Sequence, residues 1–196
     1  MSNTITQFLQ RRRSVVAKKM LPEAPDDADL DTILSCGLRV PDHSNVQPWQ
    51  IVVFSGDTRR KFGEQVVAPA ARRRADADGQ PFSDVMEELE SSRLQRAGCV
   101  IAVLCTPTPG HKIPVWEQQL TSAAVCMQML NAAQALDYAA QWITEWLAYD
   151  ADIIRALGGD PEQDQIAGFL YIGAKQEQPT ERNRPQPESK ISYWQP

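Results

Sequence analysis

The longest regular stretch of the sequence is a helical segment over residues 116–136, which carries no charged residue after Glu117. The segment is rich in Ala, Met, Leu and Gln. A surface helix keeps a polar or charged face towards water, so a helix that lacks charge all round lies inside a protein or in an interface between subunits. The rest of this chain, or a second chain, must therefore cover the segment on every side.

Three further segments have the apolar content of buried strands. Cys99–Cys105 is an unbroken apolar run, far shorter than the roughly 20 residues that cross a bilayer. Residues 49–54 and 166–173 are rich in branched and aromatic side chains, and both predict strands. A short strand is also predicted over 141–143.

Helical spacing of apolar residues predicts helices over 3–13, from a capping Asp26 or Asp27 to Gly37, and over 56–67, 83–97 and 150–157. The polar, Ala-, Arg- and Asp-rich residues 72–81 predict a mobile excursion, and 106–115, with three prolines, an irregular loop. This order has no βαβ regularity and no internal repeat. It favours an α+β fold, in which a mixed or antiparallel central sheet is flanked by helices.

The length of the chain fits a single domain over residues 1–196. Its last part, 174–196, holds four prolines and no periodicity, yet ends in Ile191, Tyr193 and Trp194. Side chains of this type favour an arm that wraps a partner surface over a tail free in solution. The sequence therefore predicts an extended C-terminal arm on a compact body.

Charge and composition restrict the partners of the chain. A net charge of −5 gives no overall attraction to nucleic acid or to anionic lipid, so the run of arginines at 72–74 is a local feature. The N-terminus lacks the apolar core of a secretory signal, and no segment is long enough to span a membrane. We therefore expect a cytoplasmic protein that binds neither nucleic acid nor membrane.

The cysteines predict neither a metal site nor a thiol enzyme. They have no metal-ligand spacing and lie in apolar stretches, as small hydrophobic residues of a reducing compartment do. The only histidines, His43 and His111, occur in no nucleophile signature. The sequence also lacks the glycine patterns of a Rossmann dinucleotide site or a P-loop.

Three separated segments carry an unusual set of polar or aromatic groups. The first is Arg12-Arg13-Ser14 at the end of a predicted helix, where guanidinium groups and a hydroxyl suit a phosphate. A solvated basic helix end is the alternative. The second segment, RVPDHSNVQPW over 39–49, sets polar side chains between stiffening prolines, and they could bind the edge of a planar heterocycle. Its alternative is an ordinary proline-bounded turn.

The third segment is QWITEW over 141–146, directly after the long helix and a short connection. Its two tryptophans bracket Thr144 and Glu145, so the segment could flank a ring and offer backbone amides to it. A purely structural aromatic cluster would account for the same residues. The residues alone leave both interpretations open.

Together these segments resemble the nitroreductase family in their order and spacing. The matching elements are RRRS near the start, RVPDHSNVQPW after the second helix, HKIPVWEQ before the long helix and WITEW after it. The resemblance extends over about residues 5–194 and is strongest to the short, YdjA-type subgroup. It implies FMN as cofactor, NAD(P)H as hydride donor, an electrophilic acceptor such as a nitro compound or quinone, and an intertwined homodimer with a C-terminal arm.

The resemblance also implies roles for individual residues. On the phosphate, ribityl chain and pyrimidine edge of FMN we expect Arg12, Arg13 and Ser14, with Arg182 and Arg184 as a basic pair that clamps the phosphate. From the other subunit, the residues expected to reach the flavin are Arg39, Pro41, His43, Ser44 and Asn45. Along the isoalloxazine we expect Trp142, Ile143 and Thr144, with the amide of Thr144 or Glu145 near the hydride-accepting nitrogen.

The sequence departs from the family pattern at two places. Val16 stands where many members have a basic residue, and Arg39 is one hypothesis for the missing positive charge. The glycines that usually precede the tryptophan element are replaced by ALDYAA over 135–140, which leaves the path of that segment open.

The implied mechanism is ping-pong hydride transfer, with NAD(P)H and the acceptor bound in turn. It needs no acid–base residue and no metal. Two alternatives remain open: another flavin reaction on the same fold, such as reductive dehalogenation, or a flavin-binding sensor or carrier without turnover.

Overall fold

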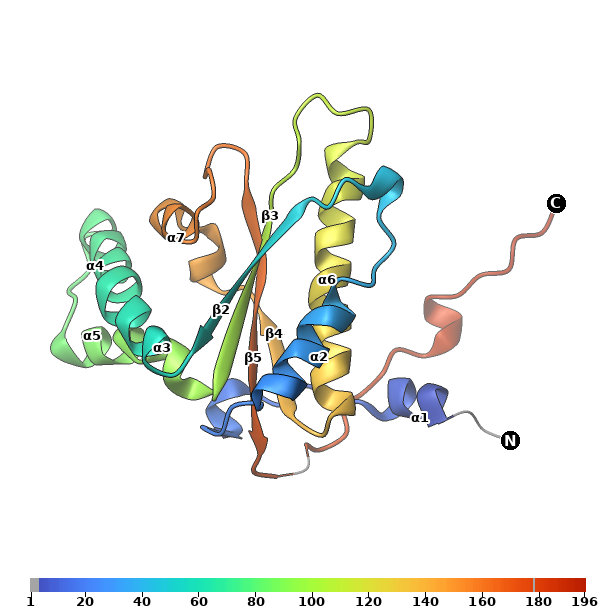
Figure 1. Cartoon of the computed structure of the whole chain (residues 1–196), viewed down its shortest axis with the longest axis horizontal. Helices are drawn as coiled ribbons and strands as arrows, with labels where there is room; N and C mark the ends of the chain where they lie inside the picture. The colour runs from blue at the N-terminus through green and yellow to red at the C-terminus, as the bar shows by residue number, and fades with distance from the viewer. Residues whose placement is uncertain (1–3, 178) are drawn as a thin grey trace.

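An antiparallel sheet crosses the centre of the protein in the computed structural model, which describes residues 4–177 and 179–196 (Figure 1). Its strands are β1 Met20–Leu21, β2 Trp49–Ser55, β3 Cys99–Cys105, β4 Ala139–Ile143 and β5 Gln165–Lys175. The strands run in the order β1-β5-β3-β2, and β4 also pairs with β5. Every pairing is antiparallel, which confirms the predicted α+β fold.

Strand β3 forms the centre of the core, because every one of its residues is buried. Successive side chains of a strand point to opposite faces of its sheet. Val100, Ala102 and Leu104 accordingly join one apolar cluster, and Ile101 and Val103 join the other. Each fully buried side chain of this size contributes about 1.5–3 kcal/mol relative to exposure in water.

Helices cover both faces of the sheet (Figure 1). On one face lie α2 Asp27–Gly37 and α6 Val115–Ala135, which pack against each other and the sheet. On the other lie α3 Asp57–Phe62, α4 Ala68–Ala77, α5 Asp84–Ser91 and α7 Ala151–Ala156. Of the two caps predicted for α2, Asp26 or Asp27, the structure has Asp26, whose side chain accepts a hydrogen bond from Asp29 N–H.

Helix α6 has nearly the predicted bounds, but one chain does not cover it on every side. Val125, Cys126 and Met129 are completely buried against α2 and the sheet. On the outer side, Trp116 is 66% exposed and Leu120 50% exposed. The outer face of α6 is therefore apolar and exposed in a single chain.

The prediction of a mobile excursion over 72–81 is wrong, because most of these residues form α4. The arginines are held at their guanidinium groups. Arg72 lies 4.9 Å from the ring centroid of Phe82 and pairs with Glu87. Arg73 pairs with Asp152, and Arg74 lies 5.0 Å from the ring centroid of Trp146. The helix predicted over 83–97 is also too long, since α5 ends at Ser91 and a 3-10 turn, Arg93–Arg96, follows.

Helix α1, Thr4–Arg11, and the segment after β5 extend from the same side of the body, next to α6 (Figure 1). Helix α1 has no buried residue. The C-terminal segment leaves the body after β5, which runs to Lys175, two residues beyond the predicted end of that strand at Gly173. At its end Tyr193 is 87% and Trp194 86% exposed. Among the helices that the structure describes, none is long and apolar enough to cross a membrane.

Candidate functional site

The first and third predicted segments lie side by side along β4. Val15 N–H donates to the carbonyl oxygen of Ala140 at 3.1 Å, and Ala17 N–H donates to Oε1 of Gln141 at 2.7 Å. The segment after α1 therefore follows the edge of β4. The surface along this edge has the arginine segment at one end and the WITEW segment at the other.

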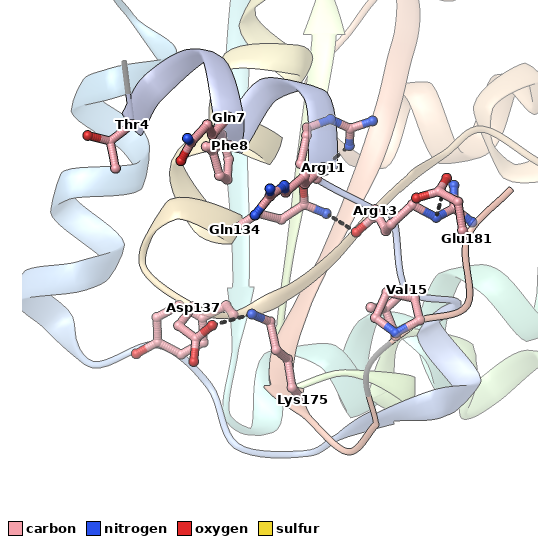
Figure 2. A pocket seen from close by; sticks show the side chains of 13 residues that line it. Thr4, Gln7, Phe8, Arg11, Arg13, Val15, Gln134, Asp137, Lys175 and Glu181 are labelled. Atoms are coloured by element: carbon pink, nitrogen blue, oxygen red, sulfur yellow. Dashed lines mark hydrogen bonds and ion pairs between the residues drawn. The ribbon is translucent and has the colours of Figure 1, made fainter. Parts of the chain in front are cut away.

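A cavity of about 530 Å³ opens at one end of this surface (Figure 2). Its walls come from α1, the end of α6, Lys175 and the C-terminal segment. Gln134, in the last turn of α6, fixes two of its arginines: its Oε1 accepts from Arg12 Nη1 at 3.2 Å, and its Nε2 donates to the carbonyl oxygen of Arg13 at 2.7 Å. Arg12 thus lines the cavity in a set direction.

Three consecutive arginines, Arg11, Arg12 and Arg13, line this cavity, and Arg184 lies beside it through Glu181. Oε1 of Glu181 lies 3.4 Å from Arg184 and 3.9 Å from Arg13, so one carboxylate serves both arginines. Arg12 has no carboxylate partner among the described residues. Partial burial, and then the positive charges of Arg184 and Arg13, lowers the pKa of Arg12. The cluster carries excess positive charge, which a bound anion would relieve.

Two other predicted phosphate ligands lie at the margin. Ser14 lines a smaller adjoining cavity of about 180 Å³, together with Val16 and Lys19. Arg182 is exposed on the C-terminal segment and donates its backbone N–H to Glu181. The structure therefore brings Arg12, Arg13 and Arg184 together and leaves Ser14 and Arg182 beside them.

At the other end of the surface, the WITEW segment lines a shallow cavity of about 370 Å³. Its lining residues are Trp142, Ile143, Thr144 and Glu145. The indole of Trp142 donates to the carbonyl oxygen of Ala167 at 3.0 Å and lies against Gly168, where any Cβ would overlap it. Gly168 has no side chain that would overlap the indole. Strand β5 therefore fixes the position of Trp142 through Ala167 and Gly168.

Glu145 has a strained backbone, with φ 51° and ψ −167°. This region is almost reserved for glycine, and another residue there costs about 1–3 kcal/mol. The amide N–H of Glu145 makes no hydrogen bond within the part of the chain that the structure describes. A backbone donor is thus available beside the cavity.

The sequence did not predict the path of residues 135–146, because the glycines usual in the family are absent there. In the structure this path depends on Asp137. This residue ends α6 in the left-handed region, with φ 69°, and pairs with Lys175. Aspartate tolerates that region better than most residues do. A non-glycine residue therefore makes the turn from α6 into β4.

The second predicted segment, 39–49, forms the loop before β2 and lies at the opposite end of α6. Ser44, Asn45 and Gln47 all have positive φ, and the carboxylate of Asp42 accepts from Gln47 N–H at 2.7 Å. His43 Nδ1 lies 2.7 Å from a carboxylate oxygen of Glu117. Pro41 and His43 line a shallow cavity over α6. Asn45 accepts a hydrogen bond from the side-chain amide of Gln47. Arg39 is exposed and forms no ion pair with any described residue.

The length of α6 separates this loop from the arginine cavity. His43 contacts Glu117 in the first turn of the helix, and Arg12 contacts Gln134 in the last. At a rise of 1.5 Å per residue these two α6 positions are about 25 Å apart. One chain therefore does not bring the loop to the cavity.

Sequence reasoning missed Gln134 and Arg93. Gln134 is a polar residue at the end of an uncharged helix, and that signal was available. Arg93 is buried against Glu90 and pairs with Glu145 beside the WITEW cavity. Its spacing from Glu90 is that of an ordinary surface pair on a helix, so the sequence offered no signal for it.

The cysteines lie apart from this surface, and three are buried. Burial raises the pKa of Cys99 to about 11 and that of Cys126 to about 12, and it also raises the pKa of Cys105. A raised thiol pKa keeps the group protonated and unreactive near neutral pH. We expect iodoacetamide to label none of these three in the native protein and all of them after unfolding. Peptide mass spectrometry measures this, and labelling before unfolding would contradict it.

Within residues 4–177 and 179–196, no group of three or more His, Cys, Asp or Glu side chains is placed to hold a metal ion.

Comparison with known proteins gives a consistent result. The sequence pattern of the Nitroreductase family matches residues 9–174. A relative from Escherichia coli (strain K12), "Putative NAD(P)H nitroreductase YdjA", is 31% identical over 195 residues, which cover 96% of this chain and 98% of the relative.

Two solved structures share the fold. The "Nitroreductase-like Family Protein" from Bacillus cereus superposes with a TM-score of 0.80 at 20% identity, over 98% of this chain and 97% of that one. A "putative nitroreductase in complex with fmn" from Desulfovibrio desulfuricans gives a TM-score of 0.71 at 22% identity, over 100% of both chains. At such identities the likeness establishes the architecture alone.

Proposed function

The chain belongs to the Nitroreductase family, and on that premise we propose that it is an FMN-dependent oxidoreductase. It takes hydride from NAD(P)H and passes it to an electrophilic acceptor such as a nitro compound or a quinone. One observation carries the proposal: the arginine segment lies against β4, the strand that leads into a cavity with a backbone amide unpaired among the described residues. The name of the E. coli relative and the FMN complex of the D. desulfuricans neighbour support the choice of substrates and cofactor.

The arginine cavity fits the phosphate of FMN. Arg12 has no carboxylate partner among the described residues, and the charges of Arg13 and Arg184 lie close to it. Charge-assisted hydrogen bonds from guanidinium groups are the usual means of holding a phosphate. We assign the phosphate to Arg12 and Arg184, with Arg13, Ser14 and Arg182 beside them.

The WITEW cavity fits a flat ring. Trp142, Ile143 and Thr144 form its wall, and the free amide N–H of Glu145 is suited to a ring edge that gains negative charge. Bound FMN would supply the hydride chemistry, accepting hydride from NAD(P)H and donating it to the acceptor. The residues orient both substrates in turn at the same place, and none is assigned as a general acid or base.

We also propose a homodimer with two shared sites. The loop bearing Arg39 and His43 lies about 25 Å along α6 from the arginine cavity, as the helix rise requires. Two α6 helices packed antiparallel on their exposed apolar faces would bring the loop of each chain to the cavity of the other. The exposed Tyr193 and Trp194 give the arm apolar side chains with which to reach the partner.

The reducing cytoplasm suits an enzyme of this kind. All four cysteines are free, and a pool of NAD(P)H is required. We place the protein there.

The proposed function is tested on the protein as purified. We expect a yellow protein whose ligand, released by heat and separated by chromatography, is FMN. Addition of NADPH or NADH without oxygen is expected to bleach the visible absorbance, and an added nitro compound or quinone to restore it. FAD, or no flavin at all, would contradict the cofactor assignment, and a flavin that neither nucleotide bleaches would indicate a binding protein without turnover.

A further inference from the structure

Two residues carry buried charge in the described part of the chain, and they form one pair. Glu90 is 9% and Arg93 8% exposed. Nε of Arg93 donates to Oε2 of Glu90 at 2.7 Å, and a second guanidinium nitrogen pairs with Oε1. The indole of Trp146 donates to the same carboxylate at 3.3 Å. Because desolvation offsets most of the attraction in a buried ion pair, stability alone is a weak reason for this arrangement.

The third nitrogen of the Arg93 guanidinium does not contact Glu90 but binds a residue that lines the WITEW cavity. Nη1 of Arg93 binds the carboxylate of Glu145, far along the chain. Among the described residues, Arg93 is the one that makes a hydrogen bond or ion pair with the Glu145 side chain. The Glu145 side chain is therefore tied to the buried pair, although it is 41% exposed.

Glu145 is also the strained residue of the site. Its φ of 51° and ψ of −167° persist only if surrounding contacts hold them. On one side its chain continues into β4, which is fixed to β5, and on the other into the 3-10 turn Trp146–Tyr149. The side chain of Glu145 is held by its ion pair with Arg93.

We propose that Arg93, held by Glu90, is a positioning residue that fixes the Glu145 peptide group beside the WITEW cavity. The inference rests on the proposed function, because the peptide N–H of Glu145 is the donor assigned to the flavin ring. Its role is to keep that donor in place before the ring becomes negatively charged. A donor already in place stabilises charge without reorganisation.

Arginine is required for geometric reasons. Burial disfavours its charge, but the hydrogen bonds and charge of Glu90, together with Glu145, outweigh this and raise the pKa of Arg93. Its fork uses three nitrogens for two carboxylates on different elements. A lysine keeps the charge but not the fork, so it cannot hold both carboxylates in this geometry.

The test is a double-mutant cycle with Arg93→Lys and Glu145→Gln in the FMN-loaded enzyme. Arg96→Lys is the matched control, since Arg96 ends the same 3-10 turn and forms no ion pair with a described residue. Three quantities are measured: the rate constant of flavin reduction by NADPH, the midpoint potential of the bound flavin, and the thermal unfolding midpoint. Both rate and potential report on the donor, whereas a merely structural role changes the unfolding midpoint alone.

We expect each single variant to slow reduction roughly tenfold to a hundredfold, the scale found for partners that orient a functional ligand. The midpoint potential should become more negative in both, because the reduced ring loses a fixed donor. The double variant should be no slower than the slower single variant, since Arg93 acts through Glu145. Arg96→Lys should match the parent in rate and potential.

Two results would overturn the inference. One is a Glu145→Gln enzyme with the rate and potential of the parent; this variant changes a half-exposed side chain and stays informative even if Arg93→Lys fails to fold. The other is an Arg93→Lys effect of full size in the Glu145→Gln background, which would mean that Arg93 acts independently of Glu145. Failure of the proposed function is separate, because it would appear in the parent protein as absence of FMN or of reduction.

Discussion

A chain that ends at Glu177 is expected to lose FMN and the dimer together. The deletion removes Arg182 and Arg184, and charge-assisted hydrogen bonds of this kind contribute about 1.5–3 kcal/mol each. It also removes Tyr193 and Trp194, whose apolar surface is exposed within one chain. Equilibrium dialysis with FMN should show no binding at micromolar protein, and sedimentation should show a monomer. The full-length chain should stay dimeric there, with an apolar interface well above about 2,000 Å².

The body of the truncated protein should remain folded, because the deleted segment is exposed and contacts the body chiefly through Arg13. The matched control is the full-length Arg182→Ala/Arg184→Ala variant, which keeps the arm. It should remain dimeric and lose affinity for FMN only. A truncated monomer that still holds FMN would refute the shared site, and a monomeric parent would remove its premise.

Replacement of Arg12 by alanine is expected to weaken FMN binding by roughly 1.5–3 kcal/mol. This corresponds to a rise in Kd of about tenfold to 150-fold. The fold should be preserved, because the one hydrogen bond of the Arg12 side chain to a described residue is with the side-chain amide of Gln134, and the Arg12 side chain is only partly buried. Isothermal titration of the flavin-free protein with FMN measures the change.

Lys18→Ala is the control for Arg12→Ala. Lys18 lies close in sequence and carries the same charge, but it is exposed and lines neither arginine-rich cavity. The control should bind FMN as the parent does. Parental affinity in Arg12→Ala would show the phosphate assignment to be wrong.

The local pattern of apolar residues predicted the main strands of the sheet and the bounds of the long helix well. Strand β3 has the bounds expected from its apolar run, and α6 begins one residue early. Strand β1 was missed, because two residues give no pattern. Helix α4 was mistaken for a mobile excursion because its arginines are held by Phe82, Glu87, Asp152 and Trp146, and sequence neighbours do not reveal such partners.

The part of the site that could be predicted is the part that depends on the type and order of residues along the chain. The resemblance anticipated that Arg184 would lie near Arg12, and the structure places them within electrostatic reach. Contact of either with FMN remains a prediction. The clamp of Arg93 on Glu145 was not foreseeable, because it joins positions 52 residues apart. The positive φ of Asp137 and Glu145 was equally hidden, since neither residue type signals it as glycine does.

The order in which the strands emerge during synthesis makes β5 decisive for folding. Strands β1, β3 and β4 all hydrogen-bond to β5, which occupies residues 165–175 of a chain of 196. Until that segment leaves the ribosome, β3 has one open edge along a completely apolar strand. Open apolar edges pair readily with other chains, and long-range pairing is slow. The growing polypeptide therefore stays prone to aggregation until β5 has left the ribosome and paired, and a chaperone bound up to that point would have most effect on its yield.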